Sequence, residues 1–538
     1  MICWGLGAFG LGLTGILETN TKEDMGEHAA LVLLWGANLA SQPNTARHLV
    51  AAKRRGAYVA TIDVRRTEAA AQSDEVFVIR PGSDAALALA LLHVIIAERL
   101  HDAEFIARHT VGFDALAEHV AAYPPEWAAA ATGIAPERIR DLARRYAATK
   151  PAMVVLGGSS MHKGSNGWHA SRAIACLPAL TGNVGVPGGG FGPRHGSASH
   201  GQALNNDLLA LDRRPSGRYG PSQMPRVTQA LTDGDVRVLV LFGTDMLSSY
   251  ADAGSVAEGL GGTDLLVSYD LFLNDTARRF ADIVLPATAW LEELGCKSTN
   301  THLYLMPKIL SSPGETRTVS WVLRELAERL DIPDFYPWTS EEGPIDAILD
   351  HPATGHATVA SLRAEGGIRP LAISHVAHPD LRFPTPSGKI ELYSERARQL
   401  GLPPLPVYED LPAAPQALRL RQGRTLTQFH GFYDHGRALP TLAAADPEPR
   451  LWISPDDASS RSVKDGDPIR VYNERGEMHA RALVTRDVPP GTVWMRDGWL
   501  GLNTLTDGSA VIPDEAVEIF GFSGGQASFD AAVEVQRI

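Results

Sequence analysis

Short apolar runs followed by segments of helical periodicity constrain the fold of this chain most strongly. The run LVLLWG (31–36) precedes a helical segment, NTARHLVAAKRRG (44–56), and a second apolar run, AYVATIDV (57–64). The run EVFVIR (75–80) then precedes an apolar helical segment (81–100). Strands that alternate with helices build parallel sheets whose faces the helices cover. The sequence therefore predicts a doubly wound α/β layer.

This pattern occurs a second time further along the chain. The run VRVLVLFGTDML (236–247) repeats the apolar strand, the glycine and the short polar pair of residues 30–40. Any two units of this kind look alike, but near-identical spacing of several features favours a duplication. Three pairs of residues lie 207, 207 and 208 positions apart: Gly36 and Gly243, Asp63 and Asp270, and Asp74 and Asp282.

The repeated pattern indicates nucleotide binding. A glycine directly after a strand lets the backbone approach a phosphate, and an acid at the end of the next strand reaches ribose hydroxyls or a purine edge. Gly36 and Asp63 meet these requirements in the first half, and Gly243 and Asp270 meet them in the second. Neither half contains a clean GxGxxG, so the pattern favours two nucleotides or one long cofactor pair over ordinary NAD binding.

Two glycine-rich loops lie between the halves, within residues 153–196. The first contains His162, and the second, GFGPRHG, contains Arg194 and His195. Glycine-rich loops beside a helix end form anion-binding concavities. The alternative is a flexible connector without a ligand.

The last part of the chain has a different pattern. A proline-rich passage (401–416) is typical of a linker, and short strands separated by turns follow it, which predicts a six-stranded type of barrel. The predicted fold is thus α/β, with two related doubly wound Rossmann-like domains and a C-terminal β-barrel. The expected domains are a first α/β domain with its crossover (1–150), the glycine-rich loops with the second α/β domain (151–345), an irregular region with the linker (346–418), and the barrel (419–538).

Composition excludes several classes of function. A formal net charge of −13 argues against nucleic-acid binding, which requires a basic face. No apolar stretch reaches the roughly 20 residues of a membrane span. The 3 cysteines are too few and too scattered for a disulfide framework, which fits a reducing compartment. We expect the cytoplasm, or the periplasm if an export signal lies upstream.

At this point the residues resemble the molybdenum or tungsten enzymes of the dimethyl sulfoxide reductase type, over essentially the whole chain. The resemblance rests on the order and spacing of LVLLWGANLASQP, IDVRRTEAAAQSDEVFVIRPGSDAAL, LTGNVGVPGGG, FADIVLPATAWLEELG and SSPGE. From LTQFHGFYDHGR through SPDDA and VKDGD to GWLGLN, the last domain is similar to that family's dinucleotide-binding barrel. The resemblance implies a bis(molybdopterin guanine dinucleotide) cofactor, with one arm for each half.

The resemblance also implies which residues bind this cofactor. Each of them has an alternative role in a turn or a cap. One arm would contact Gly36, Asn38, Asp63 and Asp84, the other Gly243, Asp270 and Asp282, and Thr427, His430 and Asn503 would close over the pterins from the barrel.

The metal ligand implied by the resemblance is Cys3. Gly36-Ala37-Asn38 matches the family's G-x-N turn, and Cys3, 33 residues before Gly36, falls at the family's ligand position. A thiolate suits a soft metal that dithiolene sulfurs already hold. The alternative is a small core cysteine, which is our interpretation of Cys176, while Cys296 is given no role.

The surroundings of Cys3 resemble the formate dehydrogenase and periplasmic nitrate reductase branches. Formate dehydrogenases carry a histidine directly after the ligand, where this chain has Trp4, and an arginine in the second glycine-rich loop. Arg194 or His195 would fill that role here, and a cation at this place would attract a small anionic substrate. Together with His162, they are the candidates for positioning substrate or moving protons.

Most members of that family also begin with a cysteine-rich iron–sulfur region, which the sequence given does not contain. A 4Fe-4S cluster is therefore expected only in an upstream region or in a partner polypeptide. The predicted function is that of a molybdenum- or tungsten-dependent oxidoreductase catalytic subunit or fragment with an electron-transfer partner, with a slight preference for a formate dehydrogenase type. The alternatives are a non-redox hydratase or transhydroxylase, and a cofactor-less structural subunit of a respiratory complex.

Overall fold

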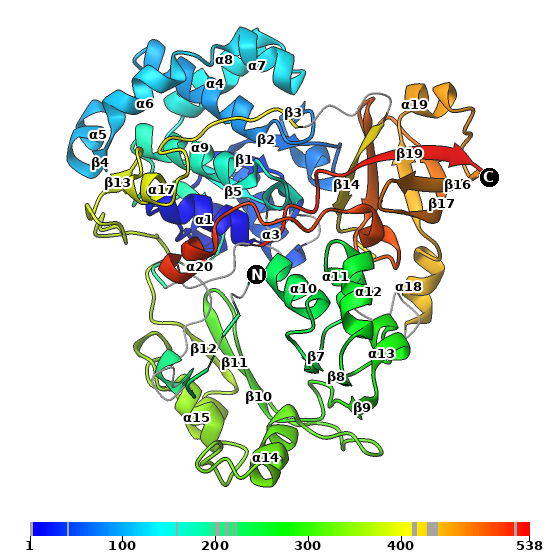
Figure 1. The fold of residues 1–538 in the computed structure, drawn as a ribbon. Coiled ribbons are helices and arrows are strands. Elements are labelled where there is room, and N and C mark those ends of the chain that lie inside the picture. The colour runs from blue at the N-terminus through cyan, green and yellow to red at the C-terminus, as the bar shows by residue number, and fades with distance from the viewer. Residues whose placement is uncertain are drawn as a thin grey trace.

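A five-stranded parallel sheet organises the first part of the chain in the computed structural model (Figure 1). The strand order is β3-β2-β1-β5-β6, and β1 lies between β2 and β5, with Leu31 opposite both Tyr58 and Ala152. The strands are β1 (Leu31–Trp35), β2 (Tyr58–Asp63), β3 (Glu75–Val78), β5 (Ala152–Leu156) and β6 (Gly190–Gly192). The structure describes residues 4–39, 42–157, 160–194, 196–198, 205–209, 215–217, 219–220, 223–411, 417–427, 439–520 and 525–538.

Helices cover both faces of this sheet. Val32 and Leu34 of β1 face α2 (Lys22–His28) and α3 (Pro43–Arg54), whereas Leu31, Leu33 and Trp35 face α4 (Asp84–Ala97) and α9 (Gly167–Leu180). All five residues of β1 are fully buried, as the continuous apolar run predicts for a central parallel strand. Helix α4 is apolar around most of its circumference because α7 (Pro125–Thr132), α8 (Pro136–Ala148) and α9 also pack against it.

The sheet extends further along the chain than predicted. Residue 150 was expected to end the first domain, but β5, α9 and β6 complete the same sheet and core. The strand β5 pairs with β1 only after a long crossover, which contains α4, α5 (Ala103–His109), α6 (Phe113–Val120), α7 and α8. The periodicity of the sequence does not indicate a pairing between strands so far apart in the chain.

Helix α1 (Gly5–Thr14) packs on α9 at very short range. A Cβ atom at Gly10 would lie 2.2 Å from the carbonyl oxygen of Trp168, and one at Gly7 would lie 2.1 Å from the ring of His162. The glycines following Cys3 in the sequence therefore allow two helices to approach closely. Cys3 itself lies outside the described residues, as do His195 and His430.

A second parallel sheet repeats the first on a smaller scale. It contains β7 (Val238–Phe242), β8 (Leu265–Asp270) and β9 (Ile283–Pro286), in the order β7-β8-β9. Gly36 N donates to Ile62 O and Gly243 N to Tyr269 O, each at 2.8 Å. Asp74 Oδ2 accepts from Val59 N, and Asp282 Oδ2 accepts from Leu266 N, again each at 2.8 Å. Equivalent residues thus make equivalent hydrogen bonds, which supports the duplication.

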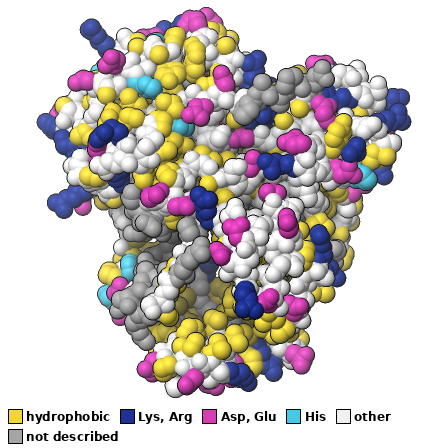
Figure 2. All heavy atoms as spheres, viewed as in Figure 1, with side chains coloured by type: hydrophobic (Ala, Val, Ile, Leu, Met, Phe, Trp, Pro, Cys, Tyr) yellow, Lys and Arg dark blue, Asp and Glu magenta, His cyan; other side chains and the backbone are white. Residues whose placement is uncertain are grey.

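A small unit follows the second sheet. The antiparallel strands β10 (Gly295–Ser298), β11 (His302–Met306) and β12 (Ile368–Pro370) share a core with α15 (Gly343–Leu349) and α16 (Val359–Ala364). The boundary predicted at residue 345 therefore falls inside α15, and residues after it are not an irregular linker region. In Figure 2, apolar side chains gather on the lower lobe. Trp290, between β9 and β10, is 62% exposed, and Ile309, after β11, is 66% exposed.

The predicted C-terminal barrel is confirmed. Its six strands close in the order β14-β18-β15-β17-β16-β19 around an apolar core. They are β14 (Leu418–Gly423), β15 (Arg450–Ile453), β16 (Pro468–Asn473), β17 (Gly476–Val484), β18 (Thr492–Arg496) and β19 (Ala532–Arg537).

The proline-rich passage before the barrel is packed rather than free, in its described part up to residue 411. The guanidinium of Arg172, on buried helix α9, donates to the carbonyl oxygens of Pro403 and Pro404. His119 bonds to Pro406 O at 2.8 Å. This passage is therefore fixed to the first domain by hydrogen bonds.

The remaining elements are shorter and lie around these units. None of the helices in the described part of the chain is both long enough and apolar enough to cross a membrane. The helices and strands not yet named are α10 (Met224–Thr232), α11 (Met246–Ser249), α12 (Ala253–Gly261), α13 (Asp275–Phe280), α14 (Val319–Arg329), α17 (Glu395–Gln399), α18 (Pro440–Ala445), α19 (Pro455–Ser460), α20 (Asp514–Phe520), β4 (Thr110–Val111) and β13 (Ile390–Glu391).

Candidate functional site

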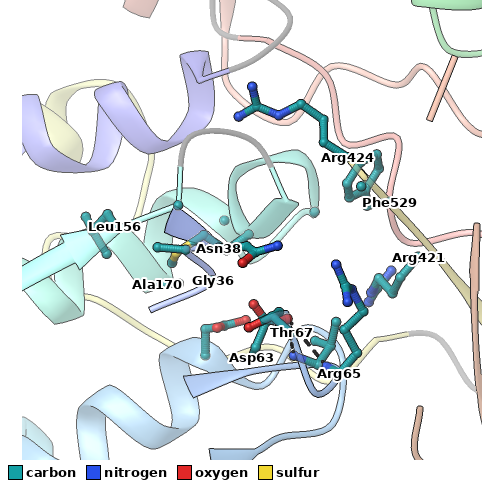
Figure 3. Close-up of a pocket in the computed structure, with 18 of the residues that line it drawn as sticks. Gly36, Asn38, Asp63, Arg65, Thr67, Leu156, Ala170, Arg421, Arg424 and Phe529 are labelled. Atoms are coloured by element: carbon teal, nitrogen blue, oxygen red, sulfur yellow. Dashed lines mark hydrogen bonds between the residues drawn. The ribbon is translucent and has the colours of Figure 1, made fainter. Parts of the chain in front are cut away.

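A deep pocket lies where the carboxyl ends of β1 and β2 meet the C-terminal barrel (Figure 3). It encloses about 1220 Å³ of unfilled space, including its open mouth. Parallel α/β sheets bind ligands at this edge. The predicted residues Gly36, Asn38, Asp63 and Asp84 all line the pocket, and so does Arg194.

Two glycines form the floor at the ends of adjacent strands. Gly36 follows β1 with φ 58°, a left-handed conformation that favours glycine. Gly157 follows β5, and a Cβ atom there would lie 1.8 Å from Gly36 O. The missing side chains let the two backbone segments meet at the pocket floor.

The two predicted acids lie side by side in the pocket. Asp63 Oδ1 accepts from Val64 N at 2.7 Å, and Asp84 Oδ1 accepts from the indole nitrogen of Trp35 at 2.9 Å. Burial raises the pKa of Asp63 to about 6, against the opposing charge of Arg65, and burial also raises the pKa of Asp84. Asn38 instead holds the neighbouring turn, since Nδ2 donates to Glu68 and Oδ1 accepts from Ala69 N.

We expect a pH-dependent stability in the cofactor-free protein that Asp63→Asn removes. The pKa of Asp63 is higher in the folded state, at about 6, than its ordinary value of 3.8, so ionising it opposes folding. The stability of the wild type relative to Asp63→Asn should fall by roughly 1 to 3 kcal/mol as the pH rises from about 4 to about 6, and then stay level. Thermal unfolding across this pH range measures the difference, with Asp264→Asn, an exposed aspartate, as the control. Identical pH profiles for wild type and Asp63→Asn would contradict it.

The barrel supplies the opposite, cationic wall. Arg421 is 5% exposed and lies 3.7 Å from Asp530 Oδ1, and Arg424 and Phe529 extend from the same side (Figure 3). Gln422 is 4% exposed, and its Nε2 atom has no hydrogen-bond partner among the described residues. A buried donor without a partner is costly, so it is set to meet an acceptor of a ligand.

Arg65 joins the two walls. It follows Asp63 by two residues, and its guanidinium lies 4.6 Å from the ring of Trp494 and 5.2 Å from that of Trp452, both on the barrel. Cation–π contacts of a desolvated arginine stabilise such an arrangement. Arg65 therefore anchors the barrel against the first sheet while lining the pocket.

A second group of predicted residues gathers around Trp4, directly after Cys3. The guanidinium of Arg194 lies 5.5 Å from the Trp4 ring centroid, and the His162 ring meets Trp4 edge-on at 5.8 Å. The backbone of Arg194 is fixed, since its N–H donates to Asn20 O at 2.7 Å and to Thr19 Oγ1 at 3.0 Å. Arg194 and His162, which are 32 residues apart in the sequence, thus share one neighbour.

His162 is held in one orientation and is uncharged. Ser171 Oγ donates to Gly167 O at 2.8 Å and therefore accepts from His162 Nδ1 at 3.1 Å. The Nε2 atom is buried. Burial, together with the charge of Arg194, lowers the pKa of His162 to about 3, so the ring is neutral at neutral pH.

The residues predicted for the second arm lie at two opposite edges of the second sheet. Gly243 and Asp270 lie at the carboxyl ends of β7 and β8, and Asp270 accepts from Asn274 Nδ2 at 2.9 Å. Asp282 lies at the opposite edge, before β9, where it accepts from Leu266 N. The structure therefore does not bring Asp282 to the ligand edge, and the spacing that suggested it reflects a repeated structural hydrogen bond.

Two of the three barrel residues predicted from the resemblance, Asn503 and Thr427, lie in the described part of the chain. Asn503 is buried and donates to Ser248 O at 2.8 Å, so it links the barrel to the second half. Thr427 shares a hydrogen bond with Thr425 at 3.0 Å and is not among the residues that line the pocket.

Sequence reasoning missed the cationic wall. Arg65 has a local signal, since it follows the predicted Asp63 in IDVRRT. Arg421 and Gln422 lie in a strand with no motif of their own, and only the docking of the barrel brings them to Asp63. Among the described residues, no three His, Cys, Asp or Glu side chains come together as metal ligands.

Comparison with known proteins assigns this architecture to a family. Residues 4–329 match the description "Molybdopterin oxidoreductase", and residues 418–518 match "Molydopterin dinucleotide binding domain". The chain belongs to the molybdopterin oxidoreductase family. It is an enzyme of that family. Cys176, which the sequence predicts to be a core cysteine, is fully buried in α9.

Individual relatives of this molybdopterin oxidoreductase are named for different activities. The chain is 32% identical to "Probable oxidoreductase YoaE" of Bacillus subtilis, over 100% of this chain and 79% of the relative. It is 30% identical to the F420-dependent formate dehydrogenase subunit alpha of Methanocaldococcus jannaschii, over 92% and 74%. The acetylene hydratase of Pelobacter acetylenicus has the same fold, with a TM-score of 0.85, 22% identity, and coverage of 100% of this chain and 81% of that chain.

The pocket fits the molybdopterin dinucleotide that the matched domain of this family implies. Such a ligand presents sugar hydroxyls and purine N–H groups to acceptors, and phosphates to cations and backbone amides. The pocket offers Asp63 and Asp84 as acceptors, Arg65, Arg421 and Arg424 as cations, and the buried Gln422 amide as a donor. The nucleotide part of the ligand therefore has matching groups here.

Proposed function

We propose that this chain is the catalytic polypeptide of a molybdenum- or tungsten-dependent oxidoreductase that carries out a two-electron reaction on a small anionic substrate. It would carry a bis(molybdopterin guanine dinucleotide) cofactor, with Cys3 as the protein ligand of the metal. A formate dehydrogenase-like reaction is slightly favoured, in line with the formate dehydrogenase relatives.

The observation that carries the proposal is the group of side chains around Trp4. Arg194 lies over one residue next to Cys3, with its backbone fixed, while it also lines the dinucleotide pocket. A guanidinium at this place binds a carboxylate or another oxyanion through charge-assisted hydrogen bonds. The substrate would therefore be held between the pocket and the Cys3 segment.

When bound, the cofactor would supply the two-electron redox chemistry. The chain would supply the side chains that position the substrate. Arg194 would orient the anion, and neutral His162, hydrogen-bonded at Nδ1 to Ser171, would help to position it. With a pKa of about 3, His162 does not store a proton at neutral pH, so its role is to position the substrate.

Two other functions remain as alternatives. The shared fold of acetylene hydratase keeps a non-redox hydratase or transhydroxylase open, and the absence of turnover with redox dyes alongside hydration activity would support it. A cofactor-less structural subunit is the second alternative. The proposal includes an electron-transfer partner, and a 4Fe-4S cluster that would lie in an upstream region or in a partner polypeptide.

Metal and pterin analysis tests the proposal. The chain, produced in a host that makes the cofactor, should contain stoichiometric molybdenum or tungsten and fluorescent oxidised pterin. Cys3→Ser should change the electron paramagnetic resonance spectrum of the metal, because a thiolate ligand is replaced by a harder oxygen. Cys296→Ser, on β10 in the small unit, is the matched control and should leave the spectrum unchanged. Protein without metal and pterin, or a Cys3→Ser spectrum identical to wild type, would contradict the proposal.

A further inference from the structure

Asn20, just before α2, is 2% exposed and uses every one of its polar atoms in a hydrogen bond. Its backbone N–H donates to Phe191 O on β6, and its backbone oxygen accepts from Arg194 N, each at 2.7 Å. Its side-chain Nδ2 atom donates to Asp24 Oδ2 at 2.8 Å and to Val186 O at 3.0 Å. The side chain of Asn20 therefore has one orientation, and its backbone oxygen has one position beside Arg194.

Asp24, on α2, fixes this asparagine from below. The carboxyl group of Asp24 is buried, and the same Oδ2 atom that accepts from Asn20 also accepts from Gly188 N at 2.8 Å. A buried carboxyl group requires such donors. Helix α2 and the loop that leads into β6 are thus tied to Asn20 at one point.

The segment after β12 holds Asn20 from the other side. Its Ala377 N–H donates to Asn20 Oδ1 at 2.9 Å. The same segment reaches the chain that follows Arg194, since a Cβ atom at Gly196 would lie 2.0 Å from Ser374 O. The backbone around Arg194 is therefore enclosed by segments that also hold Asn20.

The N–H group of Arg194 is shared between two buried acceptors. Besides Asn20 O, it meets the hydroxyl oxygen of Thr19 at 3.0 Å, and Thr19 is 5% exposed. A side chain binds a ligand in one geometry only when neighbouring groups fix its own backbone.

We propose that Asn20 and Thr19 are positioning residues for Arg194. They fix its backbone so that the guanidinium stays over the Trp4 ring, in the orientation that binds the anionic substrate. This inference rests on the proposed function, in which Arg194 holds the substrate. Neither positioning residue touches the substrate, because both act through Arg194.

Calorimetric titration of the cofactor-loaded protein with formate and with nitrate tests the inference. Asn20→Ala should weaken binding of both anions by about 3- to 30-fold, because Arg194 keeps its charge and loses its orientation. Asn473→Ala in the barrel is the matched control and should bind as wild type. The Nδ2 atom of Asn473 also donates to two acceptors, Leu505 O at 2.8 Å and Ala532 O at 3.1 Å.

A milder pair of variants keeps the test decisive if Asn20→Ala does not fold. Thr19→Val keeps the shape of the side chain and removes one acceptor of the Arg194 N–H, so it should weaken binding by about 3- to 10-fold. Thr19→Ser keeps the hydroxyl group and should bind as wild type. Circular dichroism and metal analysis check that each variant is folded and loaded.

The Arg194→Ala background separates positioning from a purely structural role. Residues that act through the guanidinium lose their influence once the guanidinium is absent. Asn20→Ala and Thr19→Val should then change the remaining affinity by less than about twofold.

Two results would overturn the inference and leave the role of Arg194 intact. The first is wild-type affinity in Thr19→Val or in folded Asn20→Ala, and the second is an undiminished effect of these substitutions in the Arg194→Ala background. Wild-type affinity in Arg194→Ala itself would contradict the proposed function, and the inference with it.

Discussion

Gly157→Ala should lower the free energy of unfolding by about 3 kcal/mol or more and abolish retention of the dinucleotide. The added Cβ would lie 1.8 Å from Gly36 O, which is backbone and cannot rotate away. The ends of β1 and β5 would have to separate, and these ends form the floor of the pocket. The backbone of Gly157 does not lie in the left-handed region, so the effect isolates steric overlap from strain.

Two measurements follow from this variant. Thermal unfolding should show the first transition lowered by on the order of 5 to 10 °C, and nucleotide released by acid should fall to background. Gly217→Ala, where the new Cβ would meet nothing within 4 Å, is the matched control and should behave as wild type. If Gly157→Ala unfolds like this control and keeps its nucleotide, the strand ends do not form the floor as described.

Arg194→Ala should weaken binding of a small oxyanion by about 10- to 100-fold, since a charge-assisted hydrogen bond contributes roughly 1.5 to 3 kcal/mol. Arg194→Lys should recover only part of this, because lysine keeps the charge and loses the planar fork that lies over Trp4. Calorimetric titration with formate and with nitrate measures binding without requiring turnover.

Steady-state kinetics with the same anions then separates binding from chemistry. The loss should fall mainly on KM, because Arg194 is proposed to hold the substrate and not to exchange its protons. Arg237→Ala is the control, since its side chain is 80% exposed on the second half. Equal affinities for formate and nitrate in Arg194→Ala and wild type would remove Arg194 from the site.

The first half and its ligand edge were predictable because their signals are local. Gly36 and Asp63 each end an apolar strand, and this position places them at the carboxyl edge of any parallel sheet. Asp84, which begins α4, was implied as a binding residue only by the family resemblance. The fold class is confirmed, including the six-stranded barrel.

The other wall of the pocket and the domain limits were not predictable from local patterns. Arg421 and Gln422 come from a strand more than 350 residues after Asp63, and only tertiary docking brings them there. The same is true of β5, which joins β1 across a long crossover. Asp282 shows the opposite error, because a repeated spacing marks shared structure and does not by itself mark shared ligand contact.

The position of Phe529 and Asp530 in the pocket wall sets an order of events during biosynthesis. Both lie within the last ten residues of the 538 given, whereas the pocket floor comes from residues near 36 and 157. A partly translated chain has the floor and lacks the wall. The wall can therefore close over the floor only after Phe529 and Asp530 have been synthesised and β19 has closed the barrel.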